Sequence, residues 1–364
     1  MILYAWGANT HGQLGLGYAS VQEIERQQVD LSETPFEADD IVGIAGGGMH
    51  TLVLDQDGDV FSCGSNIKGQ LGMTQDSLRF TQIDVLRDFK IENISCGWDF
   101  SIAISDAEKL FGWGSNIHRQ LGFSRSITST SIPSRLQISR NLATGFKLAS
   151  CGVRHSAIIT NDDAVLIAGT GSKGQLALGD SYSVSGYLSI SRIPGLDDII
   201  SVACGEDHTV ALKKDGTVFC WGDNKYGQLG VDTNLSSIYV PIVVLRDNSI
   251  LEVYAGWTHS AALTTKGEVY TWGRNDHGQL GAPRSSPFRP EKISNLKNVT
   301  SLSLGAQHSL AVTKDGGLLV WGCNEFDSCG TGDKEDVKEP TQILTNRKVK
   351  LAFACCNSSF VLTM

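Results

Sequence analysis

Apolar and polar residues alternate along short segments of this chain with the period of two that is typical of β-strands. Residues 50–64 show the pattern, because two apolar arms, HTLVLD and VFSCG, flank a polar turn at Asp57 and Gly58. Glycine readily adopts the positive φ of tight turns, so the segment predicts a β-hairpin with one buried face. A further apolar stretch precedes each such hairpin, and no helical periodicity accompanies it. We therefore expect three or four short strands in each unit.

Three short motifs repeat seven times with a period of about fifty residues. A Trp-Gly pair or its variant ends one strand, at positions 6, 63, 113, 168, 221, 272 and 321. GQLG or a variant begins five residues after each of those glycines, at 12, 69, 119, 174, 227, 278 and 327. A Gly-x-x-His turn opens the hairpin at 47, 152, 205, 256 and 305, and its degraded forms begin at Gly97 and Cys355.

The spacing of these motifs predicts the architecture. The His position and the next Trp-Gly glycine are 14 residues apart in all six complete copies, so length variation is confined to one loop per unit. Seven small sheets must stack to cover their faces, and a ring also protects the strand edges. We predict an all-β, seven-bladed β-propeller of one domain, residues 1–364. The approximate blades are 41–89, 90–146, 147–198, 199–249, 250–298, 299–348, and 349–364 with 1–40.

The two ends of the chain complement each other. The last copy stops at Met364, where its hairpin turn should come, and the first copy begins at Met1, just after such a turn. Joining residues 358–364 to 1–7 gives a His-to-Gly count of 13, one short of the usual 14. We therefore expect the terminal strands to pair within one blade and close the ring.

Composition narrows the classes of function. The formal net charge of −9 argues against sequence-independent binding of nucleic acid, and no apolar run is long enough to insert in a membrane. The N-terminus lacks the layout of a signal peptide, so a monomeric protein of the cytoplasm, or also of the nucleus, is expected. The nine cysteines are odd in number and follow the repeat, which favours reduced, buried thiols.

Neither a catalytic site nor a cofactor site is predicted. Cys323, Cys329, Cys355 and Cys356 lack the paired short spacings of a zinc site, so no metal is expected there. The sequence contains no phosphate-binding Walker motif and no serine elbow. Repeated Gly, Trp, His and Gln residues are best interpreted as blade contacts, since the same residue type at seven equivalent points supports the same packing each time.

Residues that differ between the seven copies are better candidates for a functional site than the repeated ones. The two variable residues of each Gly-x-x-His turn should ring one face of the propeller, and their aromatic and charged types suit a protein-binding surface. The candidate partner-binding residues are Trp98, Asp99, Arg154, Glu206, Asp207 and Trp257. The alternative is that the tryptophans pack beneath neighbouring loops. An acidic loop at 17–40 and a basic loop at 123–147 either steer a partner or are simply solvated.

Together, Gly-x-x-His, the hairpin, Trp-Gly-x-Asn and GQLG resemble the RCC1 repeat family over essentially the whole chain. Segments 96–100, 255–259, 272–281 and 321–330 are similar to its branch of secretion-regulating guanine nucleotide exchange factors. This resemblance implies a partner that is a small GTPase or an exocyst-type tethering subunit. Exchange activity of that kind needs no catalytic nucleophile, because the factor binds the nucleotide-free GTPase most tightly.

The resemblance leaves other functions open. In the Ran exchange factor an acidic residue and a histidine of these turns contribute to exchange. Here the turns offer Asp99, Glu206 and Asp207 but no extra histidine, so a nuclear Ran-type factor is the second choice, beside a scaffold without exchange activity. A plant ultraviolet receptor of the same family uses clustered tryptophans as its chromophore. Only Trp98 and Trp257 occupy such turns here, in non-adjacent units, so photoreception is not expected.

Overall fold

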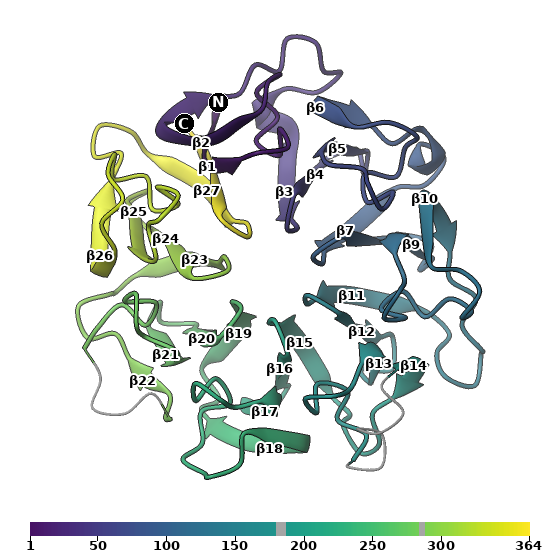
Figure 1. Cartoon of the computed structure of the whole chain (residues 1–364). Coiled ribbons are helices and arrows are strands. Elements are labelled where there is room, and N and C mark those ends of the chain that lie inside the picture. Colours follow the sequence, from purple (N-terminus) through teal and green to yellow (C-terminus); the bar gives the residue numbers. More distant parts are fainter. Residues whose placement is uncertain (180–186, 284–287) are drawn as a thin grey trace.

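A computed structural model describes residues 1–179, 187–283 and 288–364 of the chain, and no side chain of residues 187–189. In this part of the chain, seven four-stranded antiparallel sheets surround a central axis (Figure 1). The predicted seven-bladed propeller is confirmed, with four strands in each blade.

Each blade runs from an inner strand at the axis to an outer strand at the circumference (Figure 1). The inner strands are β3 (Ile41–Gly46), β7 (Ile91–Cys96), β11 (Phe146–Cys151), β15 (Ile199–Cys204), β19 (Ile250–Ala255), β23 (Val299–Leu304) and β27 (Val349–Ala354). The second strands are β4 (His50–Asp55), β8 (Phe100–Ser105), β12 (His155–Thr160), β16 (His208–Lys213), β20 (His259–Thr264), β24 (His308–Thr313) and β28 (Ser358–Thr363).

The third strands end in the Trp-Gly motif and its variants. They are β5 (Val60–Gly64), β9 (Leu110–Ser115), β13 (Val165–Thr170), β17 (Thr217–Asp223), β21 (Val269–Gly273), β25 (Leu318–Gly322) and β1 (Ile2–Asn9). The outer strands are β6 (Ser77–Gln82), β10 (Ser129–Arg135), β14 (Tyr187–Arg192), β18 (Ser237–Arg246), β22 (Glu291–Lys292), β26 (Val337–Ile343) and β2 (Ser20–Gln28). Two short 3-10 helices, η1 (Ala38–Asp40) and η2 (Asp84–Leu86), lie in the connections. We number the blades 1 to 6 from β3 to β26, and blade 7 comprises β27, β28, β1 and β2.

Blade 7 joins the two ends of the chain. Its strand order is β2-β1-β28-β27, and β1 pairs with β28 from Ile2 opposite Thr363 to Gly7 opposite Ser358. The two termini therefore lie side by side (Figure 1). The predicted closure is confirmed, and ordinary antiparallel pairing leaves β1 and β28 with a neighbour on each side.

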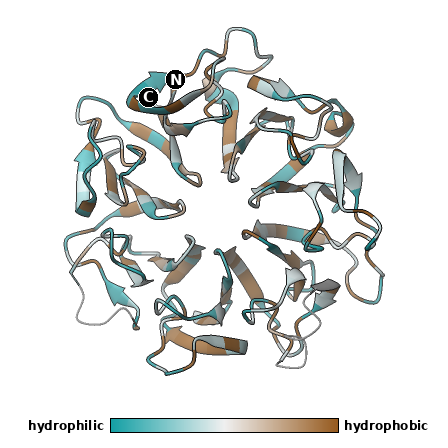
Figure 2. Ribbon diagram, in the orientation of Figure 1, coloured by the Kyte–Doolittle hydropathy of each residue, from teal (hydrophilic) through white to brown (hydrophobic). Residues whose placement is uncertain are grey.

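The second strands are buried on both faces. Every residue of β4, β8, β12, β20 and β28 is buried, so the expectation of a single buried face is wrong for these strands. The reason is that neighbouring blades cover both sides, as where Leu52 and Leu54 of blade 1 pack in one cluster with Phe111 and Trp113 of blade 2. Hydrophobic residues recur in every sheet, whereas an outer strand such as β26 is mostly hydrophilic (Figure 2).

The tight turns have the predicted backbone. Gly58 in the first hairpin turn has φ 89°, in the region that favours glycine. At the start of the GQLG motif the same region is kept even where glycine is replaced, with φ 58° at Arg119 and 56° at Asp327. These two residues carry backbone strain that the glycines of the other copies avoid. In the described residues no helix is long and apolar enough to cross a bilayer.

Candidate functional site

The five histidines of the Gly-x-x-His turns each tie their blade to the next one. His50 Nε2 lies 2.9 Å from Ser101 Oγ, and His208 Nε2 lies 2.9 Å from Ser260 Oγ. These rings are buried, and burial lowers the pKa of His50 to about 3 and of His208 to about 3. The histidines are therefore neutral architectural groups, as the repeat argument predicts.

The Trp-Gly tryptophans perform a second inter-blade contact. Trp113 Nε1 donates to Gln70 O at 2.8 Å, and Trp272 Nε1 donates to Gln228 O at 3.0 Å. Each acceptor is the glutamine carbonyl of the GQLG motif in the preceding blade, and both indoles are fully buried. Trp and Gln of the repeat thus hold the blades in register and leave the surface to other residues.

The Gly-x-x-His turns also contact each other directly around the axis. Glu206 N donates to Trp257 O at 3.0 Å, Trp257 N to Ala306 O at 2.9 Å, and Ala306 N to Cys356 O at 2.8 Å. A Cβ added to Gly256 would lie 2.7 Å from Gly305 O, which explains the glycine at this position. We call the surface formed by the variable residues of these turns the turn face. Its backbone is held by hydrogen bonds between blades.

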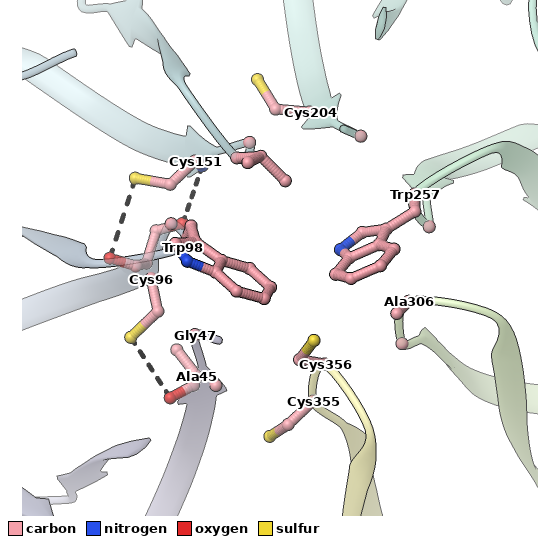
Figure 3. Close-up of a pocket in the computed structure, with 18 of the residues that line it drawn as sticks. Ala45, Gly47, Cys96, Trp98, Cys151, Cys204, Trp257, Ala306, Cys355 and Cys356 are labelled. Carbon is pink, nitrogen blue, oxygen red and sulfur yellow. Dashed lines mark hydrogen bonds between the residues drawn. The ribbon is translucent and has the colours of Figure 1, made fainter. Parts of the chain in front are cut away.

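Two tryptophans of the turn face meet across the axis. The ring centroids of Trp98 and Trp257 are 5.7 Å apart with an interplanar angle of 50°, although the residues belong to blades 2 and 5. Both rings project from opposite sides into a cavity of about 220 Å³ lined by turns of all seven blades (Figure 3). Both side chains are half-buried. The two indoles meet although their blades are not neighbours in the ring, and their role in binding a partner stays a prediction.

Carboxylates gather on the blade 4 turn. Burial raises the pKa of Asp207, and the neighbouring Asp223 raises it further, while Arg154 opposes the shift. Burial likewise raises the pKa of Glu206, with Asp207 and Asp223 adding to it. Asp207 Oδ1 accepts a hydrogen bond from Gln175 Nε2 at 2.9 Å. This acidic cluster of half-buried Glu206 and Asp207 with buried Asp223 favours the approach of a cation.

The charged residues of blades 2 and 3 lie next to this acidic cluster. Arg154 is exposed, and its charge acts on Asp207 on one side and on His118 on the other. Burial lowers the pKa of His118, Arg154 adds to that effect, and Asp99 opposes it. Burial raises the pKa of Asp99 itself. Asp99, Arg154, Glu206 and Asp207 therefore form one continuous charged arc over blades 2 to 4.

The six predicted site residues thus fall into two groups. Trp98 and Trp257 line the axial cavity, and the four charged residues form the arc beside it. Sequence reasoning missed Asp223 and Arg274, whose charges act on Glu206. Both directly follow a Trp-Gly glycine, a position occupied by Ala8, Ser65, Ser115, Thr170 and Cys323 in the other copies, so the variability of that position was the available signal. Arg274 also stacks on Tyr226, with Cζ 4.6 Å from the ring centroid.

Most of each charged loop lies at the outer edge of the ring (Figure 1), and the basic one ends in the inner strand β11. The acidic loop 17–40 includes β2 and η1, and the basic loop 123–147 includes β10. Part of each loop is already paired with other residues, since Arg79 lies 3.4 Å from Glu33 and Lys147 lies 2.6 Å from Asp163. A role for either loop in steering a partner stays a prediction.

All nine cysteines are free, as the sequence predicts. Five of them line the axial cavity around the tryptophan pair (Figure 3): Cys96, Cys151, Cys204, Cys355 and Cys356. Burial raises the pKa of the Cys204 thiol to about 12 and that of Cys356 to about 12. These thiols are protonated at neutral pH and pack as small apolar groups.

Comparison with known proteins places this geometry in a family. A family model described as an RCC1-like domain matches residues 2–362. The chain is 34% identical over 302 residues to the mouse (Mus musculus) secretion-regulating guanine nucleotide exchange factor, covering 79% of this chain and 62% of that protein. It is 31% identical over 316 residues to an ultraviolet-B receptor of Arabidopsis thaliana, covering 83% of this chain and 68% of the receptor.

Among solved structures, Prp20p of Saccharomyces cerevisiae, a protein studied for binding to Gsp1p and histones, superposes with a TM-score of 0.87. The match covers 100% of this chain and 91% of Prp20p at 23% sequence identity, so it shows the shared fold alone. The chain spans less than two thirds of the length of the mouse relative. With the family model matched from end to end, the chain belongs to the RCC1-like domain family.

Proposed function

We propose that this chain is a protein-interaction propeller that regulates a small GTPase or the secretory tethering machinery, with guanine nucleotide exchange as its activity. The observation that carries the proposal is the charged arc of Asp99, Arg154, Glu206 and Asp207 beside the Trp98–Trp257 pair. Its support from relatives is the 34% identity to a secretion-regulating guanine nucleotide exchange factor.

The turn face suits recognition of a protein partner. Hydrogen bonds between neighbouring turns hold its backbone in place before binding, which reduces the entropy lost on association. Half-buried Glu206 and Asp207 favour lysine or arginine side chains of the partner, and exposed Arg154 favours an acidic one. The two indoles supply an apolar centre next to these charges, in the arrangement common among binding hot spots.

Exchange on such a surface requires no bond chemistry. A factor that binds the nucleotide-free GTPase more tightly than the loaded form shifts the population toward nucleotide release. We assign to the carboxylates of Glu206 and Asp207 the binding of a basic side chain of the GTPase. That side chain pairs with the nucleotide phosphates when nucleotide is bound. Differential affinity for the two forms of the GTPase is then the whole source of catalysis.

The partner we favour is a small GTPase of the secretory pathway or an exocyst-type tethering subunit, bound by a monomeric propeller in the cytoplasm. A nuclear Ran-type factor is the second candidate, which the shared shape of Prp20p permits at the level of fold. A scaffold without exchange activity is the third. Release of a fluorescent nucleotide separates the first two from the third, because a scaffold binds its partner without accelerating release.

The test uses the full chain and a panel of purified small GTPases loaded with fluorescent guanine nucleotide. We expect faster release from one secretory GTPase and loss of that stimulation in the Trp98→Ala/Trp257→Ala double variant. Val240→Ala serves as the control, since Val240 is also accessible, at 50% exposed, but lies on the outer strand β18 and not on the turn face. A pull-down with the same variants covers tethering subunits. If the double variant retained every partner and full stimulation, the turn face would not be the interface.

A further inference from the structure

Three side chains of metal-ligating type meet at the junction of blades 5 and 6. His277 directly precedes the GQLG of blade 5, Cys323 directly follows the Trp-Gly of blade 6, and Asp336 directly precedes β26. The ligating atoms of all three lie within 4.8 Å of one another, and His277 Nδ1 is 2.9 Å from Asp336 Oδ2. All three residues are half-buried, so an ion can reach them and is partly shielded from bulk water.

The types of the three ligand atoms indicate which metal ion they would bind. An imidazole nitrogen, a thiolate sulfur and a carboxylate oxygen together are typical ligands of zinc, whereas calcium and magnesium take oxygen ligands alone. Zinc bonds of about 2.0 to 2.3 Å in a tetrahedron place ligand atoms roughly 3 to 4 Å apart. The side chains already lie near that spacing, so small rotations about their side-chain bonds bring them to an ion.

Lys338 is the group that a metal must displace. Its Nζ lies 3.1 Å from Asp336 Oδ2 and donates to Asp276 O at 3.0 Å. The lysine side chain is 57% exposed, and its surface ion pair with Asp336 is weak, so it can turn to solvent at little cost. A divalent ion would then balance the negative charge of the Asp336 carboxylate in place of the lysine.

Comparison with another blade junction isolates the thiol as the distinctive group. The repeat places His11 and Ser65 at the equivalent positions between blades 7 and 1, and Asp76 directly precedes β6 as Asp336 precedes β26. Asp76 Oδ1 accepts a hydrogen bond from the backbone of Asn66, as Asp336 Oδ1 does from Asn324. The blade 5 and 6 junction differs from it in carrying a cysteine where Ser65 stands. Since the fold accommodates serine at that point of the repeat, Cys323→Ser is a conservative probe.

We propose that His277, Cys323 and Asp336 form a zinc-binding site that links blades 5 and 6, with the fourth coordination position open to water or to a ligand from outside. The sequence argument against zinc compared Cys323 with the other cysteines and does not apply to this set. Cys329, six residues further on, points elsewhere, with Sγ 3.9 Å from Gly322 O and 3.8 Å from Cys323 O. The site is independent of the proposed exchange activity.

The experiment is a calorimetric titration of the metal-stripped full chain with Zn²⁺, accompanied by Co²⁺ absorption spectroscopy. We expect one ion per chain, a thiolate-to-cobalt charge-transfer band, and a melting temperature that rises with zinc. Cys323→Ser should abolish the band and weaken zinc binding by ~10-fold or more, an effect at least as large as that of losing an outer-shell partner. Asp336→Asn, which keeps the hydrogen-bonding shape, should weaken binding without the metal-free protein losing stability.

Two control variants separate this site from other histidines and thiols. His11→Ala removes the equivalent histidine of the junction that carries Ser65 in place of Cys323, and Cys356→Ser removes another half-exposed thiol. Both should bind zinc like the unaltered chain. The proposal is overturned if the unaltered chain binds no zinc, if Cys323→Ser and Asp336→Asn bind as tightly as it does, or if the two controls lose binding equally.

Discussion

The ring centroids of Trp98 and Trp257, which both line the axial cavity, lie 5.7 Å apart although their blades are not neighbours in the ring. A tilted pair at this distance is an attractive aromatic contact. It joins two parts of the ring that are three blades apart, whereas the His and Trp contacts of the repeat run between adjacent blades. The pair therefore couples blades 2 and 5 directly across the axis.

This contact predicts a measurable coupling energy. In a double-mutant cycle with Trp98→Ala and Trp257→Ala, we expect the two losses in the free energy of unfolding to be non-additive by about 0.5–1.5 kcal/mol. Urea unfolding of the two single variants and the double variant gives the value. Strictly additive losses would mean that the rings do not stabilise one another.

A second prediction concerns the close approach of neighbouring turns. Gly256→Ala would place a methyl 2.7 Å from Gly305 O and closer still to the His259 ring, so the variant should lose about 1–3 kcal/mol of stability. Gly43→Ala is the control, because the nearest atom to its added Cβ, Leu54 Cβ, is 3.8 Å away. Equal melting temperatures for the two variants would contradict the packing of the turns described above.

The repeat explains why so much of the fold could be predicted. Seven registered motifs determine the number of blades, and the missing hairpin turn between Met364 and Met1 determines which blade contains both termini. Buried His50 and Trp113 have the structural roles that seven-fold repetition implies. Residues that repeat along the chain make contacts that repeat in space. Such contacts lie within one blade or between adjacent blades.

The parts that could not be predicted depend on distances the repeat does not encode. Whether Trp98 reaches Trp257 depends on the radius of the axial cavity, which no spacing along the chain reports. Asp336 lies in the loop of variable length, so its approach to His277 and Cys323 has no register in the sequence. The sequence also did not predict that Asp223 lies near Glu206, because the two residues belong to different motifs of the same blade.

Acid should destabilise the protein through its buried histidines. Burial lowers the pKa of His155 to about 4 and of His308 to about 4, from an ordinary value of 6.5. The unfolded chain binds these protons first, so this contribution to stability is complete above about pH 6.5 and is lost as pH falls toward 4. Each histidine contributes a slope of up to about 1.4 kcal/mol per pH unit in that window.

The comparison that isolates this effect uses His308→Gln. Because other groups titrate over the same range, the informative quantity is the difference in slope of unfolding free energy against pH between the variant and the unaltered chain. We expect a shallower slope for the variant between pH 6.5 and 4. An unchanged slope would show that His308 binds its proton as readily in the folded protein as in the unfolded chain.

Relief of backbone strain gives a stabilising prediction. Arg119 has φ 58° at a point where five other copies carry glycine. Arg119→Gly should raise stability by about 0.5–1 kcal/mol, since the strain removed exceeds the entropy that glycine adds to the unfolded chain. Arg119→Ala keeps the strained conformation and should bring no gain. A gain of equal size from alanine would instead assign the effect to the arginine side chain.

The charged arc offers the most direct test of the proposal that the turn face engages a GTPase. Glu206 precedes β16 and Asp215 follows it, so Glu206→Lys and Asp215→Lys make the same charge change at opposite ends of one strand. Release of fluorescent nucleotide is measured for both variants with the GTPase that the unaltered chain stimulates. The account predicts at least about a tenfold loss of stimulation for Glu206→Lys, the size expected when a buried charge contact is reversed, and an unchanged rate for Asp215→Lys. Full stimulation by Glu206→Lys, or equal losses in both variants, would contradict it.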